Sequence, residues 1–478
     1  MEKPKVGKRR ARQSLHKVMA RGTVALVALT CAVVLFVCVF GNAILNGYGK
    51  RKAERLFAQA HPGFVLRIDS LDYSVGANRM VARSVTLSGT NTTLKVDRIS
   101  LTGVRWARAC LGKAMLADVL AKAELDATNL VIEITPARYG IRCSRLRTSV
   151  PAATLVAEGT ELRPLMDNEA FFGADQFRTA LFRVLLPECR VSGLAHDGFS
   201  RGKSFEARLV EFFRPSVEVL INRDKPPKPF VMSPPMVQEA LASIPLPMHL
   251  GILSITNGLL SYCERLAIGA DPAVITIGAV SLTAEGIANR GDSNAVIQVQ
   301  GEGYLMNAGL MKMQMTIPIT SPDFSFHYSG SLGAMDLTRL DGFLDIAERT
   351  RIKSGSAQAA DFEIDVTDGH ARGRVRATYK DLEIAMLDKQ TGSEKGLGTR
   401  VTSLFANMLK VRNANAPVGS EPRKEGEVNY TRRPDDEFQQ FAWFALRTGV
   451  LDIINFGPPP HQPVLATPNA SNASVLNK

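Results

Sequence analysis

A long uncharged stretch near the N-terminus constrains this chain more than any other feature. Residues 22–49 contain 28 consecutive side chains without a charge, and their centre, Thr23–Phe40, is almost wholly apolar. At ~1.5 Å rise per residue, about 20 such residues span the ~30 Å hydrocarbon core of a bilayer. A single segment crossing that core must satisfy its backbone hydrogen bonds internally, as only a helix does. The stretch therefore predicts a transmembrane signal-anchor at 22–49.

The flanking charges predict the orientation of this anchor. Eight Lys or Arg residues and one acid precede Gly22, so residues 1–21 form a basic tip. Basic flanks stay on the cytoplasmic side, which sends the chain after residue 50 across the membrane. A cleaved signal peptide is the alternative, but its apolar region would be shorter and would end in an A-x-A-like site. Phe40-Gly41-Asn42-Ala43 is a poor cleavage site, so we expect the anchor to remain uncleaved.

The net charge of +12 is concentrated beside the anchor. Residues 1–55 hold 12 of the 58 Lys and Arg residues and two of the 46 acids, which leaves 46 basic and 44 acidic side chains elsewhere. A basic excess beside a membrane helix favours contact with anionic lipid. It gives no argument for a nucleic-acid partner.

The rest of the chain is predicted to be mainly β with flanking helices, an α+β class. After a possible helix over 53–60, the motif His61-Pro62-Gly63 ends the helical period and a period of two begins. Apolar residues then alternate with polar ones at Leu66/Ile68, Val85/Leu87, Leu94/Val96 and Leu130/Ile132/Ile134. The phrase Val85–Gly89 nearly recurs at Ile99–Gly103 and Val280–Thr283, which indicates a repeated β-module and an open-ended sheet.

Composition divides the chain beyond the anchor into four parts. The predicted parts are a first β-rich lobe at 50–224, a Pro-rich connector with a short helix at 225–247, a second β-rich lobe at 248–456, and a disordered tail at 457–478.

Within the lobes, several elements are predicted individually. Helices are expected at 106–125, 151–187 (most clearly Asp175–Leu186), 236–243, 335–350, 396–412 and Phe438–Phe456. Strands are expected at 189–193, 205–213, 217–221, 311–319, 361–367 and 373–386. Pro318 cannot donate to a ladder, so its strand end is expected at an edge. The helix from Phe438 carries more apolar surface than a lone surface helix needs, so we expect it to cap the end of the second lobe and protect an edge strand.

No catalytic, cofactor or metal site is predicted. The seven histidines are scattered, with no two within ten residues, so helical metal-ligand spacing is absent. Ser200-x-x-Lys203 lacks the partner motifs of penicillin-binding enzymes, and Gly291-Asp292-Ser293 suits a hairpin turn. Cys110, Cys143, Cys189 and Cys263 leave two alternatives open, buried free thiols or one or two disulfides.

The apolar stripes of the predicted strands have two interpretations. They could form the buried core of ordinary sandwiches or barrels, which composition and periodicity alone favour. They could instead line an open groove that shields acyl chains from water. The candidate lining residues of such a groove are Val85, Leu87, Ile132, Ile134, Met311, Met313, Met315, Ile317, Ile319, Phe324 and Phe326.

The C-terminal third contains the segments Gly330–Leu337, Lys353–Gly355, Phe362–Ile364, Gly373–Ile384, Gly426–Tyr430 and Phe441–Gly449. With these segments, and with a basic tip and one anchor before a β-rich chain, the sequence resembles the AsmA-like family of bacterial envelope proteins. The resemblance covers the anchor, residues 64–105 and roughly residues 250–455. These segments carry no catalytic residues.

The resemblance implies an elongated, curved β-groove that extends from the bacterial inner membrane into the periplasm. It implies a non-enzymatic role in glycerophospholipid transport and outer-membrane biogenesis, with membrane lipids and an outer-membrane assembly protein as partners. A periplasmic scaffold that holds no lipid is the alternative. An envelope hydrolase ranks last, because no nucleophile has its partner residues.

Overall fold

The computed structural model describes residues 45–105, 116–227, 234–291, 295–319, 323–387, 411–416, 423–434 and 436–455. The chain divides into two compact units, unit 1 up to Leu165 and unit 2 from Met166. Most of the predicted anchor, residues 22–44, lies outside the described residues, as does the predicted tail at 457–478. Among the helices of the described ranges, none is long and apolar enough to cross a bilayer.

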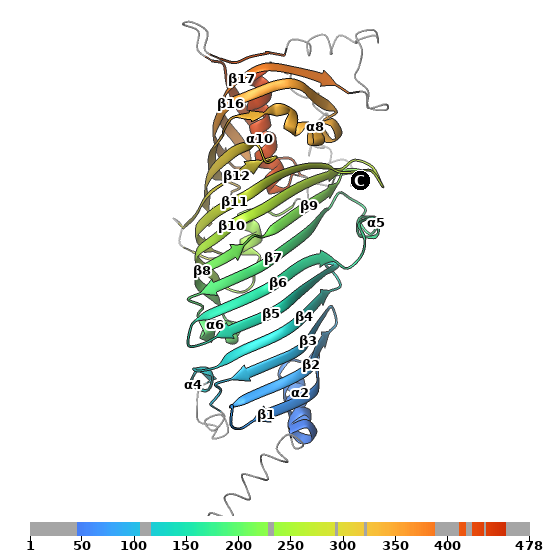
Figure 1. Cartoon of the computed structure of the whole chain (residues 1–478), viewed down its shortest axis with the longest axis vertical. Coiled ribbons are helices and arrows are strands. Elements are labelled where there is room, and N and C mark those ends of the chain that lie inside the picture. Colours follow the sequence, from blue (N-terminus) through green and yellow to red (C-terminus); the bar gives the residue numbers. More distant parts are fainter. Residues whose placement is uncertain are drawn as a thin grey trace, which may run out of the picture. The chain divides into compact units, whose positions relative to one another are not determined.

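Unit 1 is an antiparallel meander of six strands, each paired with the next along the chain (Figure 1). Each strand has eleven residues. Its elements are η1 (Leu45–Gly49), α2 (Lys50–Ala60), β1 (Phe64–Ser74), β2 (Arg79–Gly89), β3 (Thr92–Thr102), α4 (Leu116–Leu120), β4 (Glu124–Ile134), β5 (Tyr139–Ser149) and β6 (Thr154–Pro164). The period of two that begins after Pro62 therefore does mark strands.

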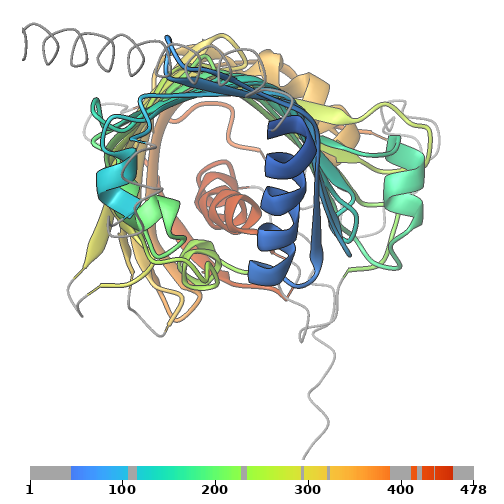
Figure 2. The same ribbon diagram turned by 90° about the horizontal axis from the view of Figure 1, so that it is seen from below.

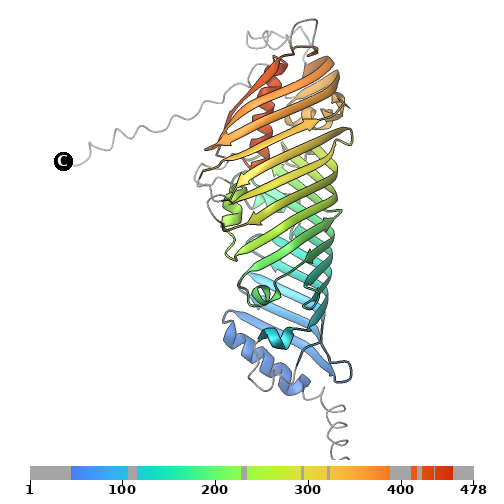
Figure 3. The same ribbon diagram turned by 90° about the vertical axis from the view of Figure 1, so that its left-hand side faces the viewer.

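Unit 2 is also built on a curved sheet (Figure 3). Its first half contains α5 (Asn168–Gly173), β7 (Ala180–Ser192), α6 (His196–Ser200), β8 (Phe205–Phe213), β9 (Ser216–Asn222), α7 (Val237–Ala242), β10 (Met248–Arg265), β11 (Ala273–Ala288) and β12 (Val296–Leu305). Its second half contains β13 (Gly309–Pro318), β14 (Phe326–Leu332), β15 (Met335–Asp336), η3 (Leu337–Leu340), α8 (Asp341–Ala347), β16 (Thr350–Thr367), β17 (His370–Met386), β18 (Glu425–Thr431) and α10 (Phe438–Ile453).

The Pro-rich connector is a crossover within unit 2 and does not separate two lobes. β8 and β9 lie end to end between β7 and β10, and both run parallel to β10. Parallel neighbours need a connection that returns along the sheet, and here this connection lies between the end of β9 at Asn222 and the start of β10 at Met248. Because the strands before and after the connector are paired, the boundary between compact units falls at Leu165, earlier than residue 225.

The predicted helix at Asp175–Leu186 is wrong, because most of it belongs to strand β7. Leu181 is fully buried, whereas Phe182, on the other side of the strand, is 37% exposed. Apolar residues on both faces of a strand give a run that periodicity cannot distinguish from a helix. Likewise, most of 151–164 is strand β6, and helix α4 ends at Leu120, before β4.

The remaining predicted elements agree with the structure where they are described. Strands β8, β9, β13, β16 and β17, and helices α7, α8 and α10, lie at the expected places. The helix expected at 396–412 falls almost wholly outside the described residues. Pro318 is the last residue of β13, beyond Thr316, where pairing with β14 ends.

Helix α10 protects the last strand of unit 2, as its sequence predicts. It packs on β17 and β18 (Figure 3), and a Cβ on Gly426 would lie 1.9 Å from the Gly449 carbonyl oxygen, so the close approach requires glycine. The N–H groups of Glu427 and Asn429 donate to the Asp452 carboxylate and the Thr448 hydroxyl at 2.9 and 3.2 Å. These bonds occupy donors that an exposed edge strand would offer to another chain.

Strand β1 is protected in the same way at the start of unit 1. The N–H of Leu71 donates to Asn46 Oδ1 at 2.6 Å, and that of Ile68 donates to Glu54 Oε1 at 2.9 Å. Lys50 Nζ donates to the Asp69 carbonyl at 3.0 Å. Side chains of η1 and α2 thus occupy backbone groups along the edge of β1 that β2 leaves unpaired.

Candidate functional site

One face of the unit 1 sheet is apolar across all six strands. Residues paired across neighbouring strands point to the same face of a sheet, so the register defines rows of side chains. Four rows on this face comprise 24 positions, and all but Thr148 and Thr160 are apolar. The rows are Leu66–Leu87–Leu94–Ile132–Ile141–Leu162, Ile68–Val85–Val96–Leu130–Cys143–Thr160, Leu71–Ala82–Ile99–Ala127–Leu146–Ala157 and Tyr73–Met80–Leu101–Leu125–Thr148–Leu155.

The opposite face of the same sheet is polar and charged. Its rows include Arg67–Thr86–Lys95–Val131–Arg142–Glu161 and Ser70–Arg83–Arg98–Thr128–Arg145–Glu158. Arg145 binds Asp126 with two hydrogen bonds, of 3.0 and 2.6 Å, and this arginine lowers the pKa of the Asp126 carboxyl despite partial burial. Arg83–Asp72 and Arg147–Glu158 form further pairs across strands. This face is therefore suited to water.

A crease across the middle of unit 1 keeps all four rows on one face. Ser84, Asn129 and Gly159, on β2, β4 and β6, have positive φ of 48°, 53° and 59°. Each left-handed residue shifts by one the alternation of side chains between the two faces of the sheet. Ala82 and Val85 therefore lie on the same face and join one cluster, although residues three apart in a regular strand lie on opposite faces. Small polar residues and glycine tolerate this conformation best. Asn129 also donates from Nδ2 to Asp97 Oδ2 at 2.8 Å within the crease.

Within the described part of unit 1, no second layer packs over the apolar face. Helix α2 and η1 contact β1, and α4 packs near Leu101 at one end. Only five of the 24 side chains are buried, and the rest are half-buried against their neighbours. A sheet with one charged and one apolar face normally covers the latter. The uncovered apolar face is therefore the candidate functional site.

Four of the predicted groove residues lie on this face. Val85, Leu87 and Ile132 belong to its rows, and Ile134 extends it beside Tyr139. Sequence reasoning missed the half beyond the crease, including Ala82, Ile99 and Leu146, because the period of two is interrupted there. One signal for this half was available in the sequence. In successive strands, a small polar residue separates two runs in which apolar and polar residues alternate.

Most of the predicted groove residues of unit 2 are instead core, which corrects that part of the prediction. Met315, Ile317, Ile319, Phe324 and Phe326 are each less than 10% exposed and join one cluster with α10 side chains. Met313 packs against this cluster while partly buried, and Met311 is half-buried. The face to which Met315 belongs is apolar from β7 to β18, through the row Val191–Val210–Leu253–Ala284–Val299–Met315–Tyr328–Ile364–Gly373–Val428.

Helix α10 closes this part of unit 2. It lies inside the curve of the surrounding strands of its unit (Figure 2). Phe441 is fully buried, with its ring centroid 5.0 Å from that of Phe324. The Tyr328 hydroxyl donates to the Ala442 carbonyl at 3.0 Å, and burial raises the pKa of Tyr328. This region is a packed core, so the carboxyl-terminal part of the face is not available to a ligand.

A polar network lies between α10 and strands β9 and β10. Tyr262 donates to Glu264 at 2.6 Å and accepts from Gln440 at 3.0 Å, while Arg223 pairs with Glu264 at 3.1 Å. Arg447 donates to Glu348 at 2.7 Å. Burial raises the pKa of Glu348 although Arg447 opposes the shift. The charges in this network are balanced, which makes it a structural connection between helix and sheet.

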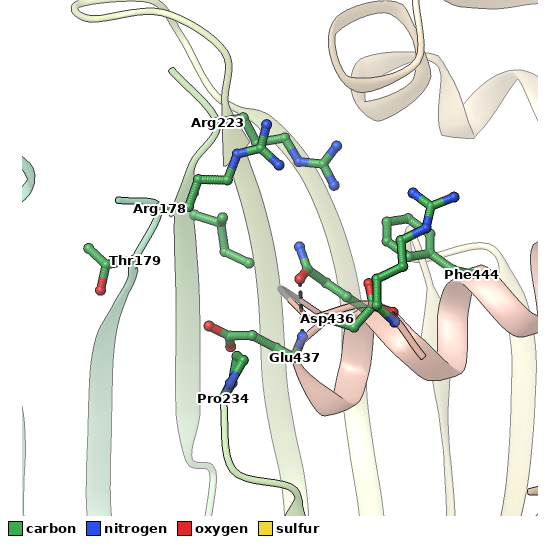
Figure 4. Close-up of a pocket in the computed structure, with 10 residues that line it drawn as sticks. Arg178, Thr179, Arg223, Pro234, Asp436, Glu437 and Phe444 are labelled. Atoms are coloured by element: carbon green, nitrogen blue, oxygen red, sulfur yellow. Dashed lines mark hydrogen bonds between the residues drawn. The ribbon is translucent and has the colours of Figure 1, made fainter. Parts of the chain in front are cut away.

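A small pocket beside this network has mixed charge. Arg178, Arg223, Asp436 and Glu437 line it near the first turn of α10 (Figure 4), with Phe444 on the helix. Its volume is about 80 Å³, against the ~300–1,000 Å³ typical of small-molecule sites. The pocket carries neither a nucleophile with a base nor room for a substrate.

Other reactive side chains do not assemble into a site among the described residues. No group of three or more His, Cys, Asp or Glu side chains there could hold a metal ion. Ser200 is the last residue of α6, Lys203 lies in the turn before β8, and Gly291 follows β11. Cys143 and Cys263 are buried free thiols, as the first of the two alternatives expects for these two, and Cys110 lies outside the described residues.

We expect Cys263 to resist alkylation in the folded protein. It is buried on β10, and burial raises the pKa of its thiol to about 11, so almost no thiolate, the reactive form, exists at pH 8. Iodoacetamide labelling followed by peptide mass spectrometry should modify Cys263 only after denaturant is added. Modification of Cys263 in native protein at the rate of a free peptide thiol would contradict its placement.

Comparison with protein-family models finds no family that matches this chain, and comparison with curated proteins finds no match.

Proposed function

We propose that this chain is an AsmA-like, inner-membrane-anchored periplasmic protein that carries the acyl chains of glycerophospholipids. The carrying surface is the uncovered apolar face of unit 1, and no covalent chemistry is involved. One observation supports this proposal above all: 22 apolar side chains lie in register on one face, with a charged face behind them.

The physical argument is the cost of leaving such a face in water. Each CH₂ group buried against it contributes ~0.8 kcal/mol, so an acyl chain of about 14 CH₂ groups gains up to ~11 kcal/mol before ordering costs. The rows offer few hydrogen-bonding groups apart from the hydroxyls of Tyr73, Thr148 and Thr160. Contact of this kind grows with the length of the acyl chain but requires no particular headgroup, so it suits a carrier of mixed lipids.

The proposed location follows from the basic tip and the uncharged stretch at 22–49. A reporter that is active only in the periplasm should work when fused after Gly457 and fail when fused at Arg12. The reverse pattern would exclude the periplasmic location.

Lipid retention tests the proposed function directly. The full chain should be purified in mild detergent, washed with lipid-free detergent, and its bound lipid quantified by mass spectrometry. We expect glycerophospholipid to remain bound in near-stoichiometric amount. Purified protein with no more lipid than an unrelated single-span membrane protein would refute the proposal.

A further inference from the structure

Helix α2 has two distinct faces, of which the bonds to strand β1 use only one. Asn46 on η1 and Lys50 and Glu54 on α2 bind the backbone of β1. Ala53 and Phe57 lie on the same side of the helix and are partly buried. These residues recur at the helical period and hold the helix on the sheet.

The other face of α2, extended by Tyr48 of η1, combines cations with an aromatic and an aliphatic side chain. Arg51, Lys52 and Arg55 are exposed, and Tyr48 and Leu56 are 62% and 55% exposed. Lys52 Nζ lies 5.8 Å from the centroid of the Tyr48 ring. The only acid of the helix, Glu54, is on the face toward β1, so the outer face carries positive charge alone.

Both the charge and the position of this face identify its partner. The uncharged stretch at 22–49 ends within η1, so α2 begins directly after it in the chain. Tyrosine is enriched at the membrane–water interface, and basic side chains near anionic lipid are attracted to its phosphates. A protein partner of matching charge would have to compete with a bilayer that is already attached to the preceding residues.

We propose that the outer face of α2 lies on the headgroup layer of an anionic bilayer, with Arg51, Lys52 and Arg55 contacting lipid phosphates. The inference rests on the membrane anchoring in the proposed function but adds a second, peripheral contact. Because the inner face of the same helix holds β1, this contact fixes the first strand of the apolar face at the membrane surface. A lipid leaving the bilayer would then meet β1 first.

A tryptophan scan of the full chain tests this contact. Tryptophan would be placed singly at 48, 51, 52 and 55 on the outer face and at 53 and 57 on the inner face, in a Trp106→Phe, Trp443→Phe background. Each variant would be reconstituted in vesicles of brominated phosphatidylcholine with phosphatidylglycerol. We expect outer positions to be quenched about twofold or more above inner ones, and this contrast should fall in vesicles without phosphatidylglycerol.

Charge reversal provides the matched comparison. Arg51→Glu, Lys52→Glu and Arg55→Glu together should remove the contrast between the outer position 48 and the inner position 57. A helix that is held near the bilayer only by the preceding anchor would show quenching that declines with distance from residue 44 and has no helical period. That pattern would overturn the inference. So would a contrast that persists after charge reversal.

The same preparations separate this inference from the proposed function. Bound glycerophospholipid measured on each variant should remain unchanged by charge reversal, because none of the three residues lies on the apolar face. Retained lipid without a periodic contrast refutes only the contact of α2. A periodic contrast without retained lipid refutes only the carrier function.

Discussion

Replacing Ile132 with Glu is expected to abolish lipid retention while the protein remains folded in the membrane fraction. Ile132 is half-buried in the middle of a six-residue apolar row, paired with Leu94 and Ile141. A carboxylate there stays hydrated when no lipid is bound, so the cost to folding is modest. It becomes large when an acyl chain excludes water, because an unpaired charge would then be buried. Bound lipid per protein should fall at least about tenfold, equivalent to ~1.4 kcal/mol or more.

The matched control is the neighbouring residue Val131. It is also half-buried, but it lies in the row with Lys95 and Arg142 on the charged face. Val131→Glu should leave both protein level and lipid retention near normal. Equal loss of lipid in the two variants would show that the effect is a general weakening of strand β4. Loss of the Ile132→Glu protein itself would indicate a packed core in unit 1.

Truncating Phe441 to Ala is expected to destabilise unit 2 severely. The Phe441 side chain is fully buried on α10 and contacts the rings of Phe324, Phe326 and Tyr430. Phe-to-Ala changes in a core cost about 3–5 kcal/mol, against total stabilities of about 5–15 kcal/mol. Limited proteolysis and thermal unfolding in detergent should show early cleavage within 436–455 and a lowered Tm. The lesion also exposes the edge of β18, so aggregation should increase.

Trp443 on the same helix is the control for this variant. It is 37% exposed and is not part of the buried cluster that contains Phe441, so Trp443→Ala removes a larger side chain without opening a cavity in that cluster. Its proteolysis pattern should stay close to that of the unchanged protein. If Phe441→Ala unfolds no earlier than Trp443→Ala, α10 does not hold the closed core together.

The sequence is sufficient to predict strands but insufficient to predict which side chains of a strand lie on the same face of the sheet. Runs such as Val85/Leu87 and Leu94/Val96 identify β2 and β3 because one face is apolar and the other polar. Ser84 and Asn129 then shift the alternation through left-handed backbone, a conformation that neither residue type requires. The sequence of β7 predicts a helix because both faces of this strand carry apolar side chains.

The two groups of predicted groove residues differ for a reason that local sequence does not contain. Val85 and Met315 both lie on apolar stripes of β strands. What separates them is that α10, more than a hundred residues after Met315, packs over its cluster, whereas no described element of unit 1 covers the rows around Val85. Periodicity shows which side of a strand is apolar. Whether that side is open depends on contacts distant in the chain.

Site-specific photo-cross-linking in growing cells tests the central proposal most directly. A photoreactive amino acid would be placed at Leu87, Leu94 or Ile132 on the apolar face, and at Thr86, Lys95 or Val131 on the charged face. These are adjacent residues on the same strands, so both sets share the same depth and expression. We predict that phospholipid is captured at the first three positions and not at the second three. Absence of captured lipid on the apolar face, or equal capture on both faces, would contradict the account.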